Sequence, residues 1–337
     1  MAATFRQSRG SKMISNRLVA KARAHTNIAI VKYWGKANSK LIIPQNSSLS
    51  LTLDRFYTDT IVKFSPDLKR DHVQINHHSV PESVKIKAVM EMVRRLAKFN
   101  YGAEIQSVNH VPTDAGLASS ASGLAALALA ASRASGLKLS KRQLSRLARH
   151  GSGSASRSIY GGWVEWQRGS DDHSSYAFPL KSVKINDLDM IAIILKRTPK
   201  KISSREGMQR SLKTSPYYPI WQKVTARDLF RAKRAIHQGD FRALGHIAET
   251  NAMRMHALTI SADPPFTYFN SDTLKAINLV QRLQRSGIEC YYTIDAGPNV
   301  KVICQHRDSP KIKQLISTEF NSHNIVISGA GPGIHLI

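Results

Sequence analysis

The segment "PTDAGLASSASGLAALALA", residues 112–130, constrains this chain more than any other. Its glycines allow the backbone to turn sharply and approach a ligand closely, and its serines supply hydroxyl donors. The alanines and leucines that follow favour a helix, whose N-terminus offers unpaired N–H groups and a positive dipole end. We therefore expect a strand over Ala103–Val108, a Gly/Ser turn that cradles phosphate, and a long helix of small residues.

The same segment has a second interpretation, a small-residue helix packed closely in a core and capped by a serine. It matches neither G-x-x-x-x-G-K-[ST] nor G-x-G-x-x-G, so the common P-loop and dinucleotide-binding motifs do not apply. Taken alone, the segment leaves both interpretations open.

The charge of the chain is strongly positive, with 49 Lys+Arg against 23 Asp+Glu and a net charge of +26. Such an excess attracts polyanions, so nucleic acid has to be considered. The basic residues are scattered through predicted elements, and no RRM aromatic motif, zinc finger or helix-turn-helix pattern is present. We expect no specific nucleic-acid partner; a phosphorylated small molecule explains the sign of the charge but not its size.

Cysteine and histidine carry no recognisable metal or disulfide pattern. Two cysteines, Cys290 and Cys304, cannot build a disulfide framework, and so few cysteines favour a reducing, cytoplasmic location. We expect both to be free thiols that face each other across a hairpin. His25 and His256 belong to no H-x-x-x-H pair, so we interpret them as structural or surface residues. No apolar run approaches the roughly 18 residues of a membrane span, and we expect no membrane partner.

Residues 1–17 are basic and serine-rich with no acidic residue, a composition seen in organellar transit peptides. We favour a disordered basic tail, or a true start at Met13, and exclude this segment from the fold.

The length of 337 residues exceeds the usual single core of roughly 100–200 residues and predicts two packed domains. A polar stretch before "LDMIAIIL" places the boundary near 185, giving an N-terminal domain over 18–185 and a C-terminal domain over 186–337. Periodicity and turn residues predict strands within 18–35, 47–53, 161–167 and 188–195, helices over 82–100, 140–151, 226–237, 240–256, 272–286 and 310–320, and a strand pair within 287–305.

Four segments together resemble one family. "PTDAGLASSASG" resembles the P-x-x-x-G-L-x-S-S-A phosphate loop of the GHMP kinase superfamily. "AHTNIAIVKYWGK" (24–36), "SGSASRSIYGG" (152–162) and "DAGPNVK" (295–301) are similar, in order and separation, to segments of the mevalonate diphosphate decarboxylase family. The similarity runs from about residue 18 to the C-terminus.

The resemblance implies ATP-dependent decarboxylation of (R)-5-diphosphomevalonate to isopentenyl diphosphate, a step of isoprenoid biosynthesis, with release of ADP, phosphate and carbon dioxide. It implies Mg²⁺ with the ATP, and an α+β GHMP kinase fold. In that fold an N-terminal domain similar to ribosomal protein S5 domain 2 precedes a ferredoxin-like C-terminal domain, with the site between them. We also expect a homodimer.

The resemblance also implies roles for individual residues. Asp295 matches the aspartate usually described as the base for the C3 hydroxyl, Arg157 meets the anionic end of the substrate, and Lys200 lies near the transferred phosphoryl group. Substrate ligands are Tyr33, Lys36, Ser152, Ser154, Arg157, Ser204 and Arg205; nucleotide ligands are Gly116, Leu117, Ala118, Ser119, Ser120 and Ser122; and Ser119 and Ser120 are also candidates to contact Mg²⁺. Trp34 is expected to pack, and Lys32 to face either way.

Several alternatives remain open. Asp295 lies in a sequence with turn chemistry of its own, Arg157 could be a solvated arginine in a Ser-rich loop, and Asp114 places an unexpected acidic group in the phosphate loop. A mevalonate 3-kinase or a phosphomevalonate decarboxylase of the same fold would share most motifs. A basic nucleic-acid-binding protein on a degenerate kinase fold is the more distant alternative.

Overall fold

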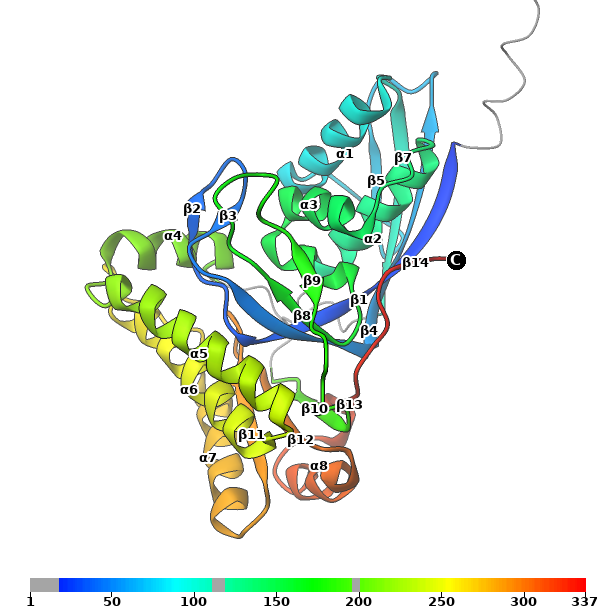
Figure 1. Ribbon diagram of the computed structural model, residues 1–337. Coiled ribbons are helices and arrows are strands. Elements are labelled where there is room, and N and C mark those ends of the chain that lie inside the picture. The colour runs from blue at the N-terminus through cyan, green and yellow to red at the C-terminus, as the bar shows by residue number, and fades with distance from the viewer. Residues whose placement is uncertain (1–17, 111–118, 196–200) are drawn as a thin grey trace, which may run out of the picture.

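The computed structural model describes residues 18–110, 119–195 and 201–337, which form two antiparallel-rich sheets with helices packed between and outside them (Figure 1). The predictions for the tail 1–17, for Asp114, for Gly116, Leu117 and Ala118, and for Lys200 lie outside the described residues.

The larger sheet has eight described strands, in the order β14-β1-β4-β7-β5-β6, with β8 paired to β4 and β9 to β8. β5 and β7 are parallel neighbours, and every other pair in this sheet is antiparallel. Its strands are β1 (Val19–Val31), β4 (Ser48–Ser65), β5 (His72–Ile75), β6 (His78–Val80), β7 (Gly102–Asn109), β8 (Trp163–Trp166), β9 (Ala177–Pro179) and β14 (His335–Leu336), and a separate hairpin joins β2 (Lys36–Asn38) to β3 (Ile43–Pro44).

Three helices, α1 (Val84–Ala97), α2 (Ser119–Ala134) and α3 (Lys141–Gly151), share a core with one face of this sheet. The alanines of α2 explain its position, because side chains this small let the helix lie close to β1 and β4. Ala125, Ala128 and Ala131 are fully buried there. Ser140 and Gln143 form a capping box that starts α3 where the sequence predicts it.

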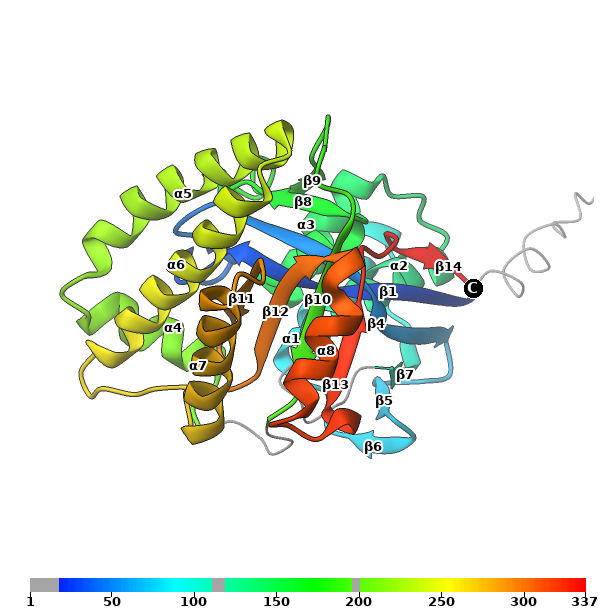
Figure 2. The ribbon, with the colours of Figure 1, turned by 90° about the horizontal axis from the view of Figure 1, so that it is seen from below.

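The smaller sheet has four described strands, in the order β11-β12-β10-β13, all antiparallel: β10 (Leu188–Ile193), β11 (Cys290–Ile294), β12 (Val300–Gln305) and β13 (Ile325–Ser328). Alternate residues of β10 serve different cores. Met190 faces α5 (Tyr218–Gln238) and α6 (Phe241–Ile260), whereas Ile191 faces α7 (Ser271–Arg285) and α8 (Ser309–Ser317). In Figure 2, α7 and α8 lie in front of this sheet. The β-α-β-β-α-β order confirms the ferredoxin-like prediction.

Helices α5 and α6 join the two sheets. Their apolar faces pack with residues of both, including Ile28 of β1 and Ile303 of β12 in one core. Trp34 is 1% exposed and lies in a cluster with Tyr218 and Trp221 of α5, which confirms its predicted packing role. Gly35 beside it has φ +97°, and a Cβ there would lie 1.8 Å from the Tyr218 hydroxyl, so this position requires glycine.

Most predicted elements are present, and the differences have physical causes. α4 (Ser204–Thr214) was not among the predicted helices; Ser203 caps it by accepting from the backbone N–H of Glu206. Arg157 lies in a 3-10 helix, Gly153–Ile159, and not in an open loop. β4 continues well past the predicted end at residue 53, and α5 begins two turns before the predicted start at 226.

Cys290 and Cys304 face each other in the β11–β12 register, and both are free and buried, as predicted. No helix within the described ranges has the length and apolar character needed to cross a bilayer. The predicted boundary near 185 falls between β9 and β10, although β14 returns to pair with β1. The domain limits remain a prediction.

Candidate active site

The helix N-terminus predicted to hold phosphate begins at Ser119. Its first turn carries no acidic residue, so the positive dipole end is not neutralised there. Ser120 is exposed, and Lys85 Nζ donates to its hydroxyl at 3.4 Å. The Ser122 hydroxyl instead contacts Thr58 Oγ1 at 2.8 Å and Thr26 Oγ1 at 3.3 Å within the core. The role of Ser122 as a nucleotide ligand therefore remains a prediction, since its hydroxyl is used inside the core.

A cluster of cations lies beside this helix start. Lys36 comes from β2, Lys85 from α1 and Arg205 from the first turn of α4. Burial, and then the charges of Arg205 and Lys85, lower the pKa of Lys36 to about 8. Burial and Arg205 also lower the pKa of Lys85. Among the described residues none of these three pairs with a carboxylate, and such a group of mutually repelling cations favours an anionic ligand.

Arg157 is 3% exposed and is held entirely by neutral oxygens. Its Nε donates to Asn27 Oδ1 and Ser50 Oγ, both at 3.0 Å, and its Nη1 to Ser48 Oγ at 2.6 Å. Within the described part of the chain nothing accepts from Nη2. Burial lowers the pKa of Arg157 to about 10, which still leaves the guanidinium charged at neutral pH.

Tyr33 and the serines lie around this arginine. The Tyr33 ring meets Trp166 edge-on at 4.8 Å between centroids, and its buried hydroxyl has no hydrogen-bond partner within the described ranges. Burial raises the pKa of Tyr33, which keeps the phenol a neutral donor. The hydroxyls of Ser152 and Ser154 contact each other at 3.2 Å. Ser204 is the first residue of α4.

Asp295 follows β11 in a tight turn, closed by the Gly297 N–H donating to the Asp295 carbonyl at 2.7 Å. Its carboxylate lies between two lysines: Lys32 Nζ is 2.8 Å from Oδ1, and Lys301 Nζ is 3.3 Å from Oδ2. Both lysine side chains are 2% exposed, whereas that of Asp295 is 28% exposed. The sequence therefore places Asp295 correctly at a hairpin turn with one side open.

The charges around Asp295 fix its protonation state. Burial alone would raise the pKa of Asp295, but the ammonium groups of Lys32 and Lys301 outweigh burial and hold it below its usual range. Burial lowers the pKa of Lys32 to about 8, against the opposing effect of Asp295. At neutral pH the site therefore holds an ionised carboxylate that can accept a hydrogen bond.

Strand β1 and Lys32, the residue that directly follows it, connect all these groups. Thr26 contacts Ser122 of α2, Asn27 contacts Arg157, and Lys32 reaches Asp295 in the other sheet. The backbone of Lys32 is fixed on both sides, because its N–H donates to Asn251 Oδ1 at 2.7 Å and its carbonyl accepts from Asn46 Nδ2 at 2.8 Å. One strand thus brings the helix start, the arginine and the aspartate to one region.

Sequence reasoning assigned no role to four residues of this region. Asn27 and Lys32 left a signal, since they flank the apolar run Ile28–Val31, and buried polar residues are unusual unless they have partners. Lys301 left a similar signal, because it is a lysine among the apolar residues of β12. Lys85 left no such signal, because in the sequence it is an ordinary polar residue of an amphipathic helix. Only the packing of α1 beside α2 brings it to Ser120.

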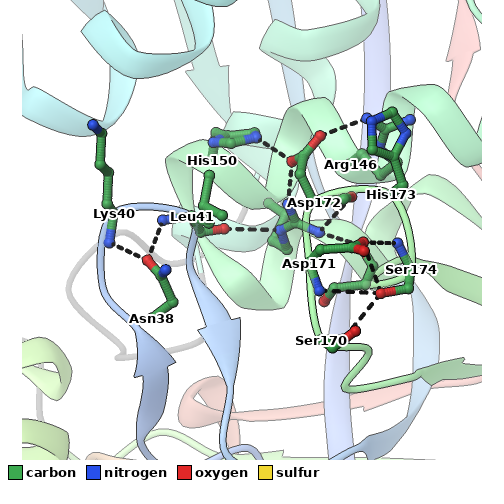
Figure 3. A network of polar contacts seen from close by, with 12 residues as sticks. Asn38, Lys40, Leu41, Arg146, His150, Ser170, Asp171, Asp172, His173 and Ser174 are labelled. Atoms are coloured by element: carbon green, nitrogen blue, oxygen red, sulfur yellow. Dashed lines mark hydrogen bonds and ion pairs between the residues drawn. The ribbon is translucent and has the colours of Figure 1, made fainter.

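A polar network anchors the hairpin that carries Lys36 (Figure 3). Arg149 is fully buried, and its Nε donates to the Leu41 carbonyl at the tip of this hairpin at 3.1 Å. Arg149 and Arg146 bind the carboxylate of Asp172, and His150 Nε2 lies 2.7 Å from it. Burial opposes ionisation, but these partners lower the pKa of Asp172 to about 2. Asp172 therefore compensates the buried charge behind the hairpin.

We expect Asp172→Asn to lower the free energy of unfolding by about 3 kcal/mol at pH 7, because Arg149 would keep a buried, unpaired charge. The pKa of Asp172 is depressed in the folded protein, so its contribution is present above the unfolded value of about 4 and is lost as the pH falls towards 2. Urea unfolding should show that the difference in free energy of unfolding between wild type and variant shrinks as the pH falls from about 4 towards 2. The neighbouring exposed Asp171→Asn is the control, and an equal loss in both variants would contradict this role.

Comparisons with known proteins agree with this geometry. Residues 24–177 match the family model of the diphosphomevalonate decarboxylase-like N-terminal domain, and residues 190–329 match that of the mevalonate 5-diphosphate decarboxylase C-terminal domain. The diphosphomevalonate decarboxylase of Homo sapiens is 34% identical over 304 residues, which cover 83% of this chain and 75% of the human protein. That of Ganoderma lucidum is 34% identical over 328 residues, covering 89% and 82%.

Solved structures give the same result. The mevalonate diphosphate decarboxylase of Staphylococcus aureus superposes with a TM-score of 0.92 at 45% identity, covering 96% of this chain and 99% of that chain. The Enterococcus faecalis enzyme superposes with a TM-score of 0.90 at 47% identity, covering 95% and 99%. These matches span both sheets and confirm the predicted GHMP kinase fold. The chain belongs to the diphosphomevalonate decarboxylase family.

Proposed function

We propose that this protein catalyses the ATP-dependent decarboxylation of (R)-5-diphosphomevalonate to isopentenyl diphosphate, with release of ADP, phosphate and carbon dioxide. One observation carries the proposal. Asp295 is ionised between two buried lysines. Contacts of β1 and of Lys32 bring it into one region with Arg157 and the start of α2. A related structure, described as MDDEF in complex with MVAPP, AMPPCP and magnesium, has 47% sequence identity and a TM-score of 0.92.

The reaction has two demands. The C3 hydroxyl must first take up the γ-phosphoryl group of ATP, which turns a poor leaving group into a good one. The C3–O bond then breaks as the C1–C2 bond releases carbon dioxide, and the electron pair of C1–C2 becomes the second bond between C2 and C3. The site therefore has to hold two anions, the substrate and the nucleotide, with the hydroxyl between them.

Asp295 is assigned to the hydroxyl. Its ionised oxygens accept the hydroxyl hydrogen bond and orient the nucleophile towards the phosphoryl group. A carboxylate with so low a pKa is a weak base, so it takes the proton only after the hydroxyl oxygen has begun to bond to phosphorus and has become acidic. Phosphoryl transfer through a loose transition state needs little more from a base.

The cations are assigned to the substrate. Arg157 presents a rigid, charged fork to the anionic end of the substrate, and the neutral oxygens that hold it do not consume its charge. Lys36 and Arg205 lie together and suit a diphosphate. Tyr33, Ser152, Ser154 and Ser204 supply neutral donors around them, and the role of Lys200 near the transferred phosphoryl group remains a prediction.

The start of α2 is assigned to ATP. Ser119 and Ser120 are proposed phosphate ligands, together with Gly116, Leu117 and Ala118, and Ser122 remains a predicted one. The helix start supplies hydroxyls, N–H groups and a neighbouring lysine, a donor set that suits phosphate oxygens and leaves hydroxyl oxygens for a metal ion that arrives with them. Mg²⁺ would be held by Ser119 or Ser120 and would neutralise charge between the β- and γ-phosphates.

A comparison of three substrates tests the proposal. ADP release is followed by a coupled assay with mevalonate, its 5-phosphate and its 5-diphosphate, each at equal ionic strength. We expect kcat/KM to be highest for the diphosphate, because it carries the most phosphate charge for Lys36 and Arg205 to bind. Preference for unphosphorylated mevalonate would indicate a 3-kinase, and preference for the monophosphate a phosphomevalonate decarboxylase.

The homodimer and the cytoplasmic location also belong to this proposal. Sedimentation equilibrium should give twice the mass of a 37.4 kDa chain, and a single-chain mass would reject the dimer. The free, unlinked Cys290 and Cys304 suit a reducing compartment. Cell fractionation would locate the protein directly.

A further inference from the structure

We propose that Lys301 is a positioning residue for this decarboxylation: by binding Oδ2 of Asp295 it fixes which carboxylate oxygen meets the substrate hydroxyl and keeps the carboxylate ionised. The inference rests on the proposed function and assigns a role to a residue of "DAGPNVK" that lies six positions after the aspartate.

The place of Lys301 in the sheet makes its role specific. It lies on β12, the strand between β11 and β10, opposite Thr293 on one side and Ala192 on the other. Its Nζ lies 3.3 Å from Asp295 Oδ2 and donates to the Asn299 carbonyl at 3.2 Å. The ammonium thus holds both ends of the turn that presents Asp295.

Within the described ranges Lys301 forms no ion pair other than the one with Asp295. Its side chain is 2% exposed, and Asp295 is the one carboxylate there with which it pairs. A buried lysine is costly unless it is compensated, so a lysine at a position that β-sheet packing would fill with an apolar residue needs a reason beyond stability. Holding the reactive carboxylate supplies that reason.

The two lysines bind different oxygens of the Asp295 carboxylate. Lys32 holds Oδ1 at 2.8 Å and also donates to the Ala29 carbonyl, so it ties Asp295 to β1 of the larger sheet. Lys301 ties Oδ2 to the hairpin of Asp295 itself. With both oxygens held from different directions, the carboxylate cannot rotate, and each oxygen keeps one fixed direction for a further hydrogen bond.

The charged and titratable groups that face Asp295 come from four parts of the structure. Lys32 directly follows β1, Lys301 lies on β12, Arg157 on the 3-10 helix Gly153–Ile159, and His256 on α6. Burial, followed by the charge of Lys32, lowers the pKa of His256 to about 3, so His256 is neutral and cannot replace a lost ammonium. Loss of Lys301 therefore shifts the pKa of Asp295 upward, with Lys32 and Arg157 left to oppose burial.

The pH profile of two neutral variants, Lys301→Met and Lys301→Gln, tests this role. The acid limb of kcat/KM for the diphosphate should move to higher pH by about one to three units, the effect of removing one close opposite charge. At neutral pH kcat should fall by about tenfold to a hundredfold, from loss of alignment, with little change in KM for ATP. Lys301→Arg should bring the acid limb back towards its wild-type position.

Lys233→Met is the matched control. Lys233 also pairs with a poorly exposed carboxylate, Glu165, at 2.8 Å, but in a different part of the structure. This variant should lose stability and keep the wild-type pH profile. A wild-type acid limb in both folded Lys301 variants would overturn the proposal, as would failure of both to fold when Lys233→Met folds. Absence of turnover in the wild type would instead reject the proposed function.

Discussion

Replacing Asp295 by asparagine should lower kcat for diphosphomevalonate by about 10²–10⁴, the range expected for loss of an acid–base group. Asparagine has nearly the same shape, but it cannot take the hydroxyl proton, and it leaves the ammonium groups of Lys32 and Lys301 facing each other without a carboxylate. Single-turnover measurements of ADP formation, with saturating ATP and substrate, would measure the effect on the chemical step.

Asp189→Asn is a suitable control for this experiment. Asp189 is a buried carboxylate of the same sheet, paired with His306 at 2.9 Å. It lies opposite Cys304, near the end of the strands away from the Asp295 turn, which connects Ile294 to Val300. This variant should lose stability without losing the chemical step. Near-normal turnover of Asp295→Asn, with an intact thermal transition, would reject the assigned role of Asp295.

Replacing Arg157 by methionine should have the second large effect, a loss in kcat/KM for diphosphomevalonate of about 10³ or more. The guanidinium is buried and has no carboxylate partner among the described residues, so its neutral partners leave its interaction with an anionic substrate strong. ATP binding should change little, because Arg157 contacts β1 and β4 and not the start of α2. Titration with a fluorescent ATP analogue, alongside the steady-state assay, would separate the two effects.

Arg282→Met controls for the loss of an arginine as such. Arg282 lies on α7 and pairs with Glu319 on the outer side of the smaller sheet. Its replacement should leave both kcat/KM for diphosphomevalonate and the affinity for ATP close to wild type. If Arg157→Met weakened ATP binding as much as it weakened turnover, the arginine would belong to the nucleotide and not to the substrate.

Local chemistry was sufficient to predict much of this molecule. The small residues of α2 predict close packing, and Ala128 is fully buried. Ser140 predicts the start of α3, and its capping box is present. The turn residues after Ile294 predict a hairpin with Asp295 at its tip, and β11 and β12 form it. In each case the cause lies within a few residues along the chain, where propensity and capping act.

The rest depended on contacts between distant segments. Lys32 and Asp295 are 263 positions apart, and nothing local to either shows that they share a proton-binding site. The start of α4 was missed because Ser204 and Arg205 were interpreted only as substrate ligands, although Ser203 and Glu206 beside them form an ordinary helix cap. Asn27 was overlooked next to the apolar run Ile28–Val31, where its polarity was the signal that it has a partner, Arg157.

The most direct test of the whole account is the ratio of carbon dioxide to ADP. Purified protein is given ATP, Mg²⁺ and diphosphomevalonate labelled with ¹⁴C in its carboxyl group, and both products are counted over the same turnovers. The account predicts one carbon dioxide for each ADP, together with isopentenyl diphosphate. Formation of ADP with the label retained in a phosphorylated acid would contradict it and identify a kinase.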